Sequence, residues 1–220
     1  MSLTSNRTRC QQGGFALFTI IIAVIFLMAA ITAMVAVSRT SATVTTDNAK
    51  PFANAILMQA NNLAMGFQAM EARGSLAANI TYDNVATTGL LNPSAGGLSP
   101  QIPPAKAFTS GATQQFWVYK GANVKVKGVG VDANGDYAFA LVGLDTSICQ
   151  EINRALTNST TIPASTLAST VFVLGTTVIT APTDATVADM SGVAAVSGAL
   201  QVCVSTTDSK NVFYVVAEPQ

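Results

Sequence analysis

The most informative part of the sequence is FALFTIIIAVIFLMAAITAMVAV, residues 15–37, in which Thr19 and Thr32 are the only polar side chains. As a helix this segment would be about 35 Å long at ~1.5 Å per residue, enough to cross a hydrocarbon core of about 30 Å. It is longer than the apolar region of a cleaved signal peptide, and residues 38–42 (SRTSA) make a poor cleavage site. We therefore expect a retained membrane-spanning helix.

The charges around this segment predict its orientation. Arg7 and Arg9 precede it, no acidic residue does, and the next charge along the chain is Arg39. The positive-inside rule then predicts that the start of the chain stays in the cytoplasm and that the bulk of the chain is exported.

The composition argues against several classes of function. The 220 residues suffice for one domain and a tail, and eleven basic side chains balance eleven acidic ones, so no basic excess favours nucleic-acid binding. There is no histidine, which removes Ser-His-Asp and Cys-His catalysis and His-ligated zinc. Asp145 and Glu151 lie on one predicted short helix, but paired carboxylates also need a pocket. We expect neither an enzyme nor a cofactor, and no nucleic acid as a partner.

A short polar leader ends in glycine just before the apolar segment, where residues 9–17 read RCQQGGFAL. This junction resembles the type IV pilins and their pseudopilin relatives, in which a prepilin peptidase cuts after the glycine and methylates the new N-terminal residue. The resemblance implies a leader over residues 1–14, cleavage between Gly14 and Phe15, and N-methylation of Phe15. A glycine suits the protease because a residue without Cβ permits close approach of the backbone. The alternative is a plain signal anchor that is never cleaved.

One position departs from the family pattern. The resemblance implies that Phe15, Leu17 and Thr19 take part in filament assembly, but pilins usually carry a glutamate where this chain has Thr19. In the filament that carboxylate is thought to pair with the N-terminal amine of a neighbouring subunit. Threonine cannot neutralise an ammonium, and losing one partner of a buried ion pair costs about 3–5 kcal/mol. We therefore expect a minor or pilin-like subunit rather than the bulk pilin.

A second helix is predicted over residues 50–73. Its apolar side chains recur at helical spacing on one face, namely Phe52, Ile56, Leu63, Phe67 and Met70. Pro51 either starts this helix or kinks a continuous one, and Arg73-Gly74 supplies a cation and a glycine stop. In a pilin-like molecule residues 15–73 would form one long N-terminal helix, with a membrane half over 15–38 and an amphipathic half over 50–73.

The rest of the chain predicts a sheet that follows a long connection. Residues 74–115 are dense in glycine and proline, and we expect a loop region that wraps the domain surface. Residues 116–220 contain a predicted helix over 145–156 and strand-like runs over 116–120, 124–131, 137–144, 171–180, 200–205 and 212–217. This order predicts an α+β fold, in which a long N-terminal hydrophobic helix packs on a C-terminal antiparallel β-sheet domain, a pilin-like roll with one disulfide.

Cys149 and Cys203 are the only cysteines beyond the apolar segment. An even pair in an exported domain predicts a disulfide. Type IV pilins typically close their C-terminal region with one such bond, so the resemblance points to the same pairing. Cys10 lies in the leader and would be lost with it.

Asp132, Asn134 and Asp136 place oxygen ligands at alternate positions, as at the start of a calcium loop. The positions where such a loop needs an acidic residue and a glycine are occupied by Gly143 and Tyr137, respectively. Between two predicted strands, Asn134-Gly135 is better explained as a hairpin turn. Calcium is the weaker alternative, and no other metal site is expected.

Together these features predict a structural filament subunit. The resemblance implies a single-pass protein of the inner membrane with a periplasmic C-terminal domain. After leader cleavage, an inner-membrane assembly platform would move it from membrane lipid into an extracellular filament with other pilin subunits. A retractable pilus, a secretion pseudopilus and a DNA-uptake filament all stay open, as does a role in adhesion. The rival from another class is a membrane-anchored protein with an exported binding domain that never polymerises.

Overall fold

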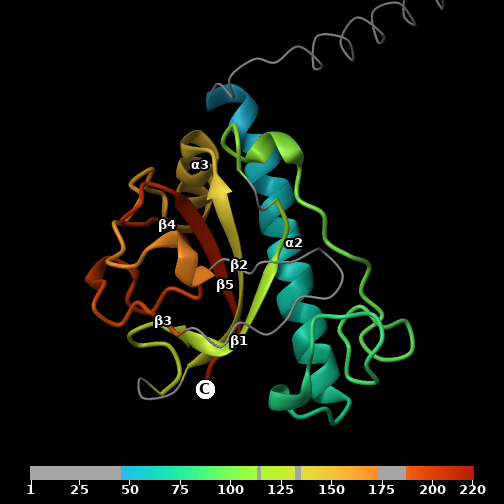
Figure 1. Cartoon of the computed structure of the whole chain (residues 1–220). Coiled ribbons are helices and arrows are strands. Elements are labelled where there is room, and N and C mark those ends of the chain that lie inside the picture. The colour runs from blue at the N-terminus through green and yellow to red at the C-terminus, as the bar shows by residue number, and fades with distance from the viewer. Residues whose placement is uncertain (1–45, 113–114, 132–134, 173–186) are drawn as a thin grey trace, which may run out of the picture. The chain divides into compact units, whose positions relative to one another are not determined.

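The computed structural model describes residues 46–112, 115–131, 135–172 and 187–220 (Figure 1). All of them belong to Val44–Gln220, the second of two units into which the chain divides. The leader over 1–14 and the apolar segment over 15–37 lie outside the described residues.

The described residues of this unit form two α-helices and five strands, and Figure 1 shows α2 running along the length of the sheet. The helices are α2 (Thr46–Ala72) and α3 (Thr146–Thr157). The strands are β1 (Val118–Lys125), β2 (Asp136–Leu144), β3 (Ala188–Asp189), β4 (Gln201–Ser205) and β5 (Asn211–Glu218). Short 3-10 helices cover Ala77–Asn79, Ala105–Ala107, Ser169–Phe172 and Ala194–Val196.

The sheet is mixed, so the predicted antiparallel sheet is wrong. Its strand order is β3-β1-β2-β5-β4, and β1, β2, β5 and β4 pair in antiparallel fashion. At the other edge, Ala188 and Asp189 pair in parallel with Val124 and Lys125. The physical reason is that β1 would otherwise be an edge strand with unpaired backbone groups. The chain that returns to this edge satisfies one of them, since the Met190 amide donates to the Lys125 carbonyl at 2.8 Å.

The predicted long hydrophobic N-terminal helix is also not found in the described structure. The helix that packs on the sheet begins at Thr46 and is amphipathic, with polar residues such as Asn54 and Asn62 on its exposed side. Among the residues that the structure describes, no helix combines the length and the apolar character needed to cross a membrane. The fold class predicted from sequence therefore needs correction to a mixed sheet covered by an amphipathic helix.

One face of the sheet packs against α2 and α3. The buried side of α2 carries Ala49, Ala53, Ile56, Ala60, Leu63, Phe67 and Met70. They meet aromatic side chains of the strands, and the Phe67 ring lies 6.2 Å from Tyr119 and 5.5 Å from Tyr137 between centroids. The predicted apolar face of this helix is thus confirmed, with Phe52 only partly buried.

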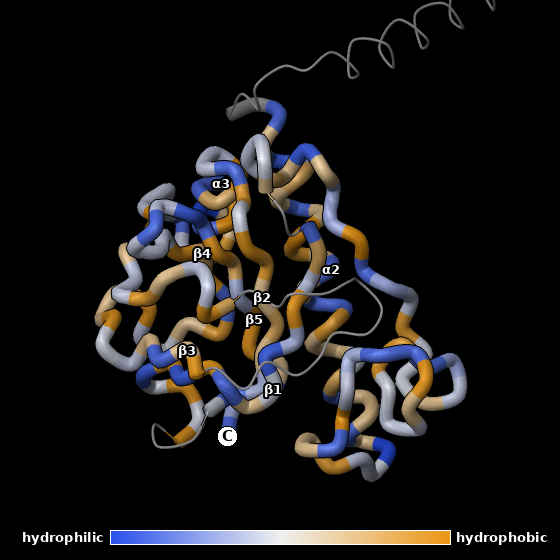
Figure 2. Tube along the Cα trace, viewed as in Figure 1, coloured by the Kyte–Doolittle hydropathy of each residue, from blue (hydrophilic) through white to orange (hydrophobic). Residues whose placement is uncertain are grey.

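The opposite face of the sheet is buried too. A second core of Val124, Ala138, Ala140, Val142, Val202, Val204, Val212, Tyr214 and Val216 packs under the described residues of 167–199, including Phe172, Met190 and Val196. All nine residues of β2 are buried as a result. Figure 2 shows hydrophobic residues running along the strands.

The predicted strands differ from the observed ones in two places. The runs over 116–120 and 124–131 were expected as separate strands, but β1 joins parts of both, with register shifts around Gly121 and Ala122. At the start of the run over 171–180 lies the 3-10 helix Ser169–Phe172, and residues 173–180 lie outside the described part. The strand predictions at 137–144, 200–205 and 212–217 are confirmed by β2, β4 and β5.

The connection over 74–115 contains no strand in its described part and packs closely on α2 and the sheet. Leu90 and Tyr82 are buried, and Tyr82 meets the Phe139 ring edge-on with the centroids 5.6 Å apart. Gly66 in α2 lies where a Cβ would overlap the Leu98 side chain, so the connection packs directly on this turn of the helix.

Replacing Phe67 by alanine removes a fully buried ring from the contact between α2 and the sheet. We expect the free energy of unfolding to fall by about 3–5 kcal/mol. Met65, two residues earlier, is 65% exposed. Met65→Ala should therefore change stability by less than about 0.5 kcal/mol. Urea unfolding of the full-length protein in detergent measures both, and equal losses would contradict the assigned orientation of α2.

Candidate functional site

The exposed side of α2 is the most distinctive surface of the described structure. Its exposed positions recur at intervals of three and four residues and so form one stripe along the helix. This stripe, called the outer face below, consists of Pro51, Asn54, Met58, Asn62, Met65 and Ala69. Met58 is 67% exposed and Met65 is 65% exposed, so two large apolar side chains of this face lie in water.

The outer face carries no charge. Residues 51–70 of α2 contain no Asp, Glu, Lys or Arg. An exposed helix face normally carries charged side chains, which keep it hydrated and form pairs one turn apart. Methionine and asparagine instead offer a flexible apolar contact and a side-chain amide that can donate and accept. Chemically, this surface can pack against another uncharged helix without taking a charge out of water.

A small hollow of about 220 Å³ lies between the start of α2 and α3, lined by Lys50, Ala53, Asn54, Glu151, Arg154 and Ala155. Its carboxylate is already paired, since Arg154 Nη2 lies 2.6 Å from Glu151 Oε2. Asp145 and Glu151, the carboxylates singled out in the sequence, have structural roles. Asp145 caps α3 by accepting from the Ser147 amide at 2.9 Å. The arrangement holds α3 in place and presents no free acid and base pair.

The predicted disulfide is present between Cys149 in α3 and Cys203 in β4, with Cα atoms 5.5 Å apart. Beside it, the buried Asn153 side chain bonds to the backbone of β4. Its Nδ2 donates to the Cys203 carbonyl at 2.8 Å, and its Oδ1 accepts from the Cys203 amide at 2.8 Å. Sequence reasoning missed Asn153, although its position four residues after Cys149 on one helix face would place it near the same strand. The disulfide and the Asn153 side-chain amide together fasten α3 to β4, at the edge of the sheet.

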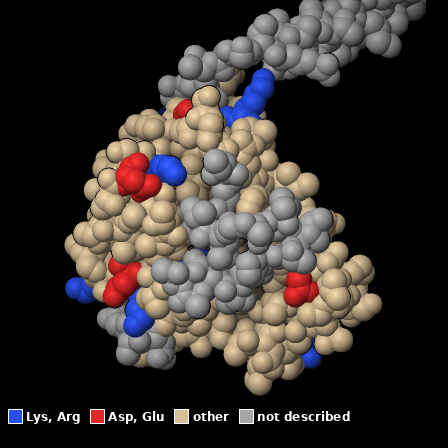
Figure 3. All heavy atoms as spheres, in the orientation of Figure 1, with Lys and Arg blue, Asp and Glu red and all other residues tan. Residues whose placement is uncertain are grey.

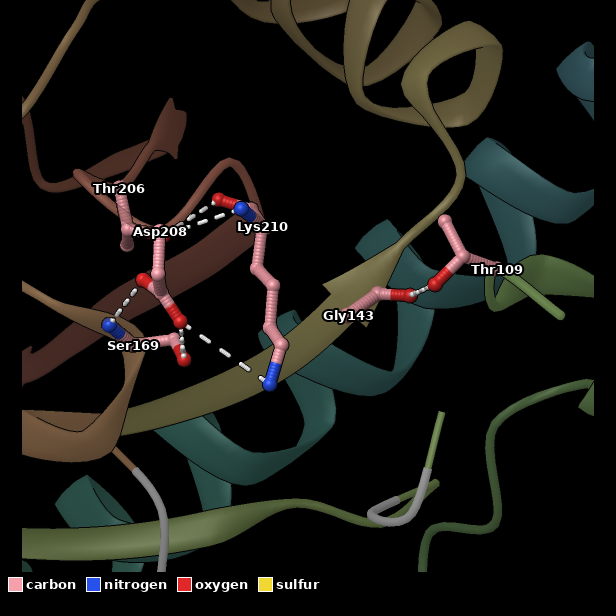
Figure 4. Close-up of polar contacts among 6 residues, drawn as sticks. All are labelled: Thr109, Gly143, Ser169, Thr206, Asp208 and Lys210. Atoms are coloured by element: carbon pink, nitrogen blue, oxygen red, sulfur yellow. Dashed lines mark hydrogen bonds and ion pairs between the residues drawn. The ribbon is translucent and has the colours of Figure 1, made fainter. Parts of the chain in front are cut away.

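The turn between β4 and β5 holds a polar cluster on the other side of the sheet (Figure 4). Asp208 accepts two hydrogen bonds from Ser169, from the amide at 2.7 Å and from the hydroxyl at 2.5 Å. These two hydrogen bonds lower the pKa of Asp208 to about 2, and the bond from the Ser169 hydroxyl has the larger effect. Lys210 Nζ lies 4.0 Å away, and Thr206 closes the turn by accepting from the Lys210 amide. The cluster fixes the segment that covers the second core.

Several predicted site residues lie outside the described residues: Gly14, Phe15, Leu17, Thr19, Asp132 and Asn134. Asp136, the third candidate calcium ligand, is buried, and its Oδ1 accepts from the Gln220 amide at 3.0 Å. Within the described ranges, no three of the metal-ligating side chains come together. The cleavage, methylation and calcium assignments therefore stay predictions.

Among the described residues on the face seen in Figure 3, charged side chains are sparse, lie singly or in small groups and form no extended patch of one sign. Comparisons with protein-family models, with curated proteins and with solved structures gave no match.

Replacing Asp208 by asparagine weakens the contact with Ser169. Because the folded-state pKa of Asp208 is depressed, the stability it contributes is present above the ordinary carboxyl pKa and is lost as the pH falls through about 2. We expect Asp208→Asn to lower the free energy of unfolding at neutral pH by about 1 kcal/mol, with the difference disappearing in strong acid.

The matched control is Lys210→Gln, which removes only the 4.0 Å ion pair and should cost less than about 0.5 kcal/mol. Denaturant unfolding of the full-length protein from neutral pH to about pH 2 measures both variants. An Asp208→Asn deficit that persists undiminished in acid would contradict the assignment.

Proposed function

We propose that this protein is a structural subunit, minor or pilin-like, of a type IV pilus or related pseudopilus filament. It would be held in the inner membrane by residues 15–37, with the Val44–Gln220 unit in the periplasm, and would join other pilin subunits after cleavage between Gly14 and Phe15. The observation that carries the proposal is the uncharged outer face of α2, which follows the apolar segment along the chain.

The apolar segment contains small residues that would favour packing between subunits. In lipid, association of apolar segments depends on close packing and not on the hydrophobic effect, so small residues at the contact favour it. Residues 29–36 offer four such positions, at Ala29, Ala30, Ala33 and Ala36. A subunit leaving the membrane exchanges lipid contacts for contacts with its neighbours. Thr19, which lacks a carboxylate, fits a subunit present in few copies.

The outer face of α2 would let the folded unit pack against a neighbouring subunit as well. Packing a helix face against a neighbour removes it from water, and a buried unpaired charge costs several kcal/mol. Between Pro51 and Met70 this cost does not arise, because the helix carries no charge there. Burial of Met58 and Met65 would add a favourable apolar contribution of about 25 cal/mol per Å². The rim of the contact would use asparagine amides.

The remaining structure suits a load-bearing subunit. The Cys149–Cys203 bond and the Asn153 amide fasten α3 to β4, and both faces of the sheet are buried. A unit held in this way resists local opening, because opening would expose apolar surface and unpaired backbone groups together. Such rigidity serves a filament, although it would also serve a membrane-anchored binding domain.

Leader cleavage separates this proposal from the anchored, non-polymerising alternative. Mass spectrometry of the protein extracted from membranes of its native host should find N-methylated Phe15 as the first residue. Cleavage would matter for assembly because it lets the apolar segment leave the membrane without drawing Arg7 and Arg9 through it. A mature protein that still begins at Met1, and is missing from sheared surface fibres, would support the anchored alternative.

Substitution of the outer face tests assembly directly. Met65→Glu places a charge where a neighbouring helix would pack, and we expect incorporation into sheared filaments to fall at least several-fold. Met65→Gln is the matched control, since glutamine has a similar length and polarity without the charge and should assemble far better. Because Met65 is 65% exposed, both variants should fold as well as the wild type by thermal unfolding. Equal incorporation of both variants and the wild type would contradict the proposed contact.

A further inference from the structure

In the described sheet β4 is an edge strand, and one row of its backbone groups points away from β5. In an antiparallel pair, the backbone groups of alternate residues face the partner strand. Leu200 faces β5, because its carbonyl accepts from the Val216 amide at 2.8 Å. By the same alternation, Gln201, Cys203 and Ser205 direct their amides and carbonyls outward. Such a row is a template on which a strand of another chain can pair.

The side chains of β4 offer little protection against such pairing. Natural edge strands commonly carry charged residues, above all lysine, which would be buried if a second strand were added. Residues 190–207 contain no Asp, Glu, Lys or Arg, and β4 itself reads QVCVS. A short uncharged run that is rich in β-branched residues is also typical of segments that aggregate. Protection of this edge must therefore come from groups of other elements.

The chain that follows α3 closes one end of the outward row. A left-handed residue, Asn158, ends α3, and the chain then returns to β4. The Ser205 amide donates to the Pro163 carbonyl at 2.9 Å, and the Ser165 amide donates to the Ser205 carbonyl at 2.7 Å. This contact is an isolated bridge at Ser205 and does not extend to Cys203. The middle of the row needs a different partner.

The side chain of Asn153 supplies that partner. Its Oδ1 accepts from the Cys203 amide and its Nδ2 donates to the Cys203 carbonyl, both at 2.8 Å. Nδ2 also donates to the Thr161 carbonyl at 3.0 Å, so both polar atoms of this buried amide have partners. A carboxamide offers the same kinds of donor and acceptor as a peptide group. Asn153 thus forms with Cys203 the two bonds that a residue of a neighbouring antiparallel strand would form.

The helix and the disulfide hold the Asn153 amide in position. Cys149 and Asn153 are four residues apart in α3 and therefore lie on the same side of the helix. Cys149 is bonded to Cys203, which is the residue whose backbone the Asn153 amide covers. The amide consequently stays opposite the Cys203 backbone as long as α3 stays docked on β4.

We propose that Asn153 is a one-residue substitute for a neighbouring strand, which closes the β4 edge against pairing with a strand of a second copy. Without the amide, α3 would lie over an unpaired N–H and C=O of Cys203, which is unfavourable in a buried place. The cover would then open more often, and a strand of another copy could satisfy both groups. This inference concerns the domain itself and does not depend on whether the protein forms filaments.

Residue-resolved hydrogen exchange of the full-length protein in detergent tests the contact. In the wild type, the Cys203 amide should be about as protected as those of Val202 and Val204, which face β5. Asn153→Leu keeps a similar side-chain shape without the hydrogen bonds and should speed exchange of the Cys203 amide at least tenfold. Fast exchange of Cys203 in the wild type would overturn the proposal, and so would an unchanged rate in the variant.

Self-association tests the consequence for the edge. Phe139→Leu is the stability control, because Phe139 is fully buried in the central strand β2 and its loss uncovers no edge. At urea concentrations that make the two variants equally stable, sedimentation should find several-fold more oligomer for Asn153→Leu, with the amides of residues 201–205 protected inside it. Equal association of the two variants would overturn the proposal, as would oligomers in which these amides exchange freely.

Asn153→Ala separates loss of the amide from gain of an apolar side chain. It removes the same hydrogen bonds and adds no new apolar group, so it should associate as Asn153→Leu does. It also provides the test if the leucine variant does not fold. Association of the leucine variant alone would assign the effect to the leucine side chain and would overturn the proposed role of Asn153.

Discussion

The contact between α2 and the sheet is the constraint on which the rest of the structure depends. Ala53 and Ala60 let the helix lie close to the strands, while Phe67 inserts between Tyr119 and Tyr137. Because a helix presents only one side to a sheet, this packing also fixes which side faces outward. The orientation of the outer face and the bond from Gln68 to the Ala217 carbonyl of β5 are both consequences of the same buried stripe.

The second core explains why β2 is buried along its whole length, which the contact with α2 alone does not. A sheet covered on one face shows alternating hydropathy, but a sheet buried on both faces needs nearly continuous apolar strands. β2 is of this second kind, since every one of its residues is buried. Its outer cover comes from the described residues around Phe172, Met190 and Val196, which include two short 3-10 helices. Asp208 holds that cover by its two bonds from Ser169.

The sequence predicted those parts of the fold that local patterns determine. Helical spacing placed the buried side of α2 and predicted the helix over 145–156 that is observed as α3, and the cysteine count gave the Cys149–Cys203 bond. It could not predict the parallel pairing of Ala188 with Val124, because a two-residue strand has no periodicity. The bond from the Gln68 side chain to the Ala217 carbonyl was equally hidden, since the two residues are far apart in the chain and only the tertiary packing brings them together. Of the predicted site, the residues from Gly14 to Thr19 rest on sequence alone.

Helix stability by itself does not account for the composition of the outer face. Asparagine is a poor helix former because its side chain competes for backbone hydrogen bonds, whereas Lys, Glu and Arg favour helices and keep them soluble. Yet Asn54, Asn61 and Asn62 lie in the middle of α2 beside exposed Met58. Of these asparagines, Asn61 accepts a bond from Gln201, which is a contact within the fold. Asn54 and Asn62 are exposed on the outer face, and their amides have the chemistry of a surface that exchanges water for another protein surface, as the filament proposal requires.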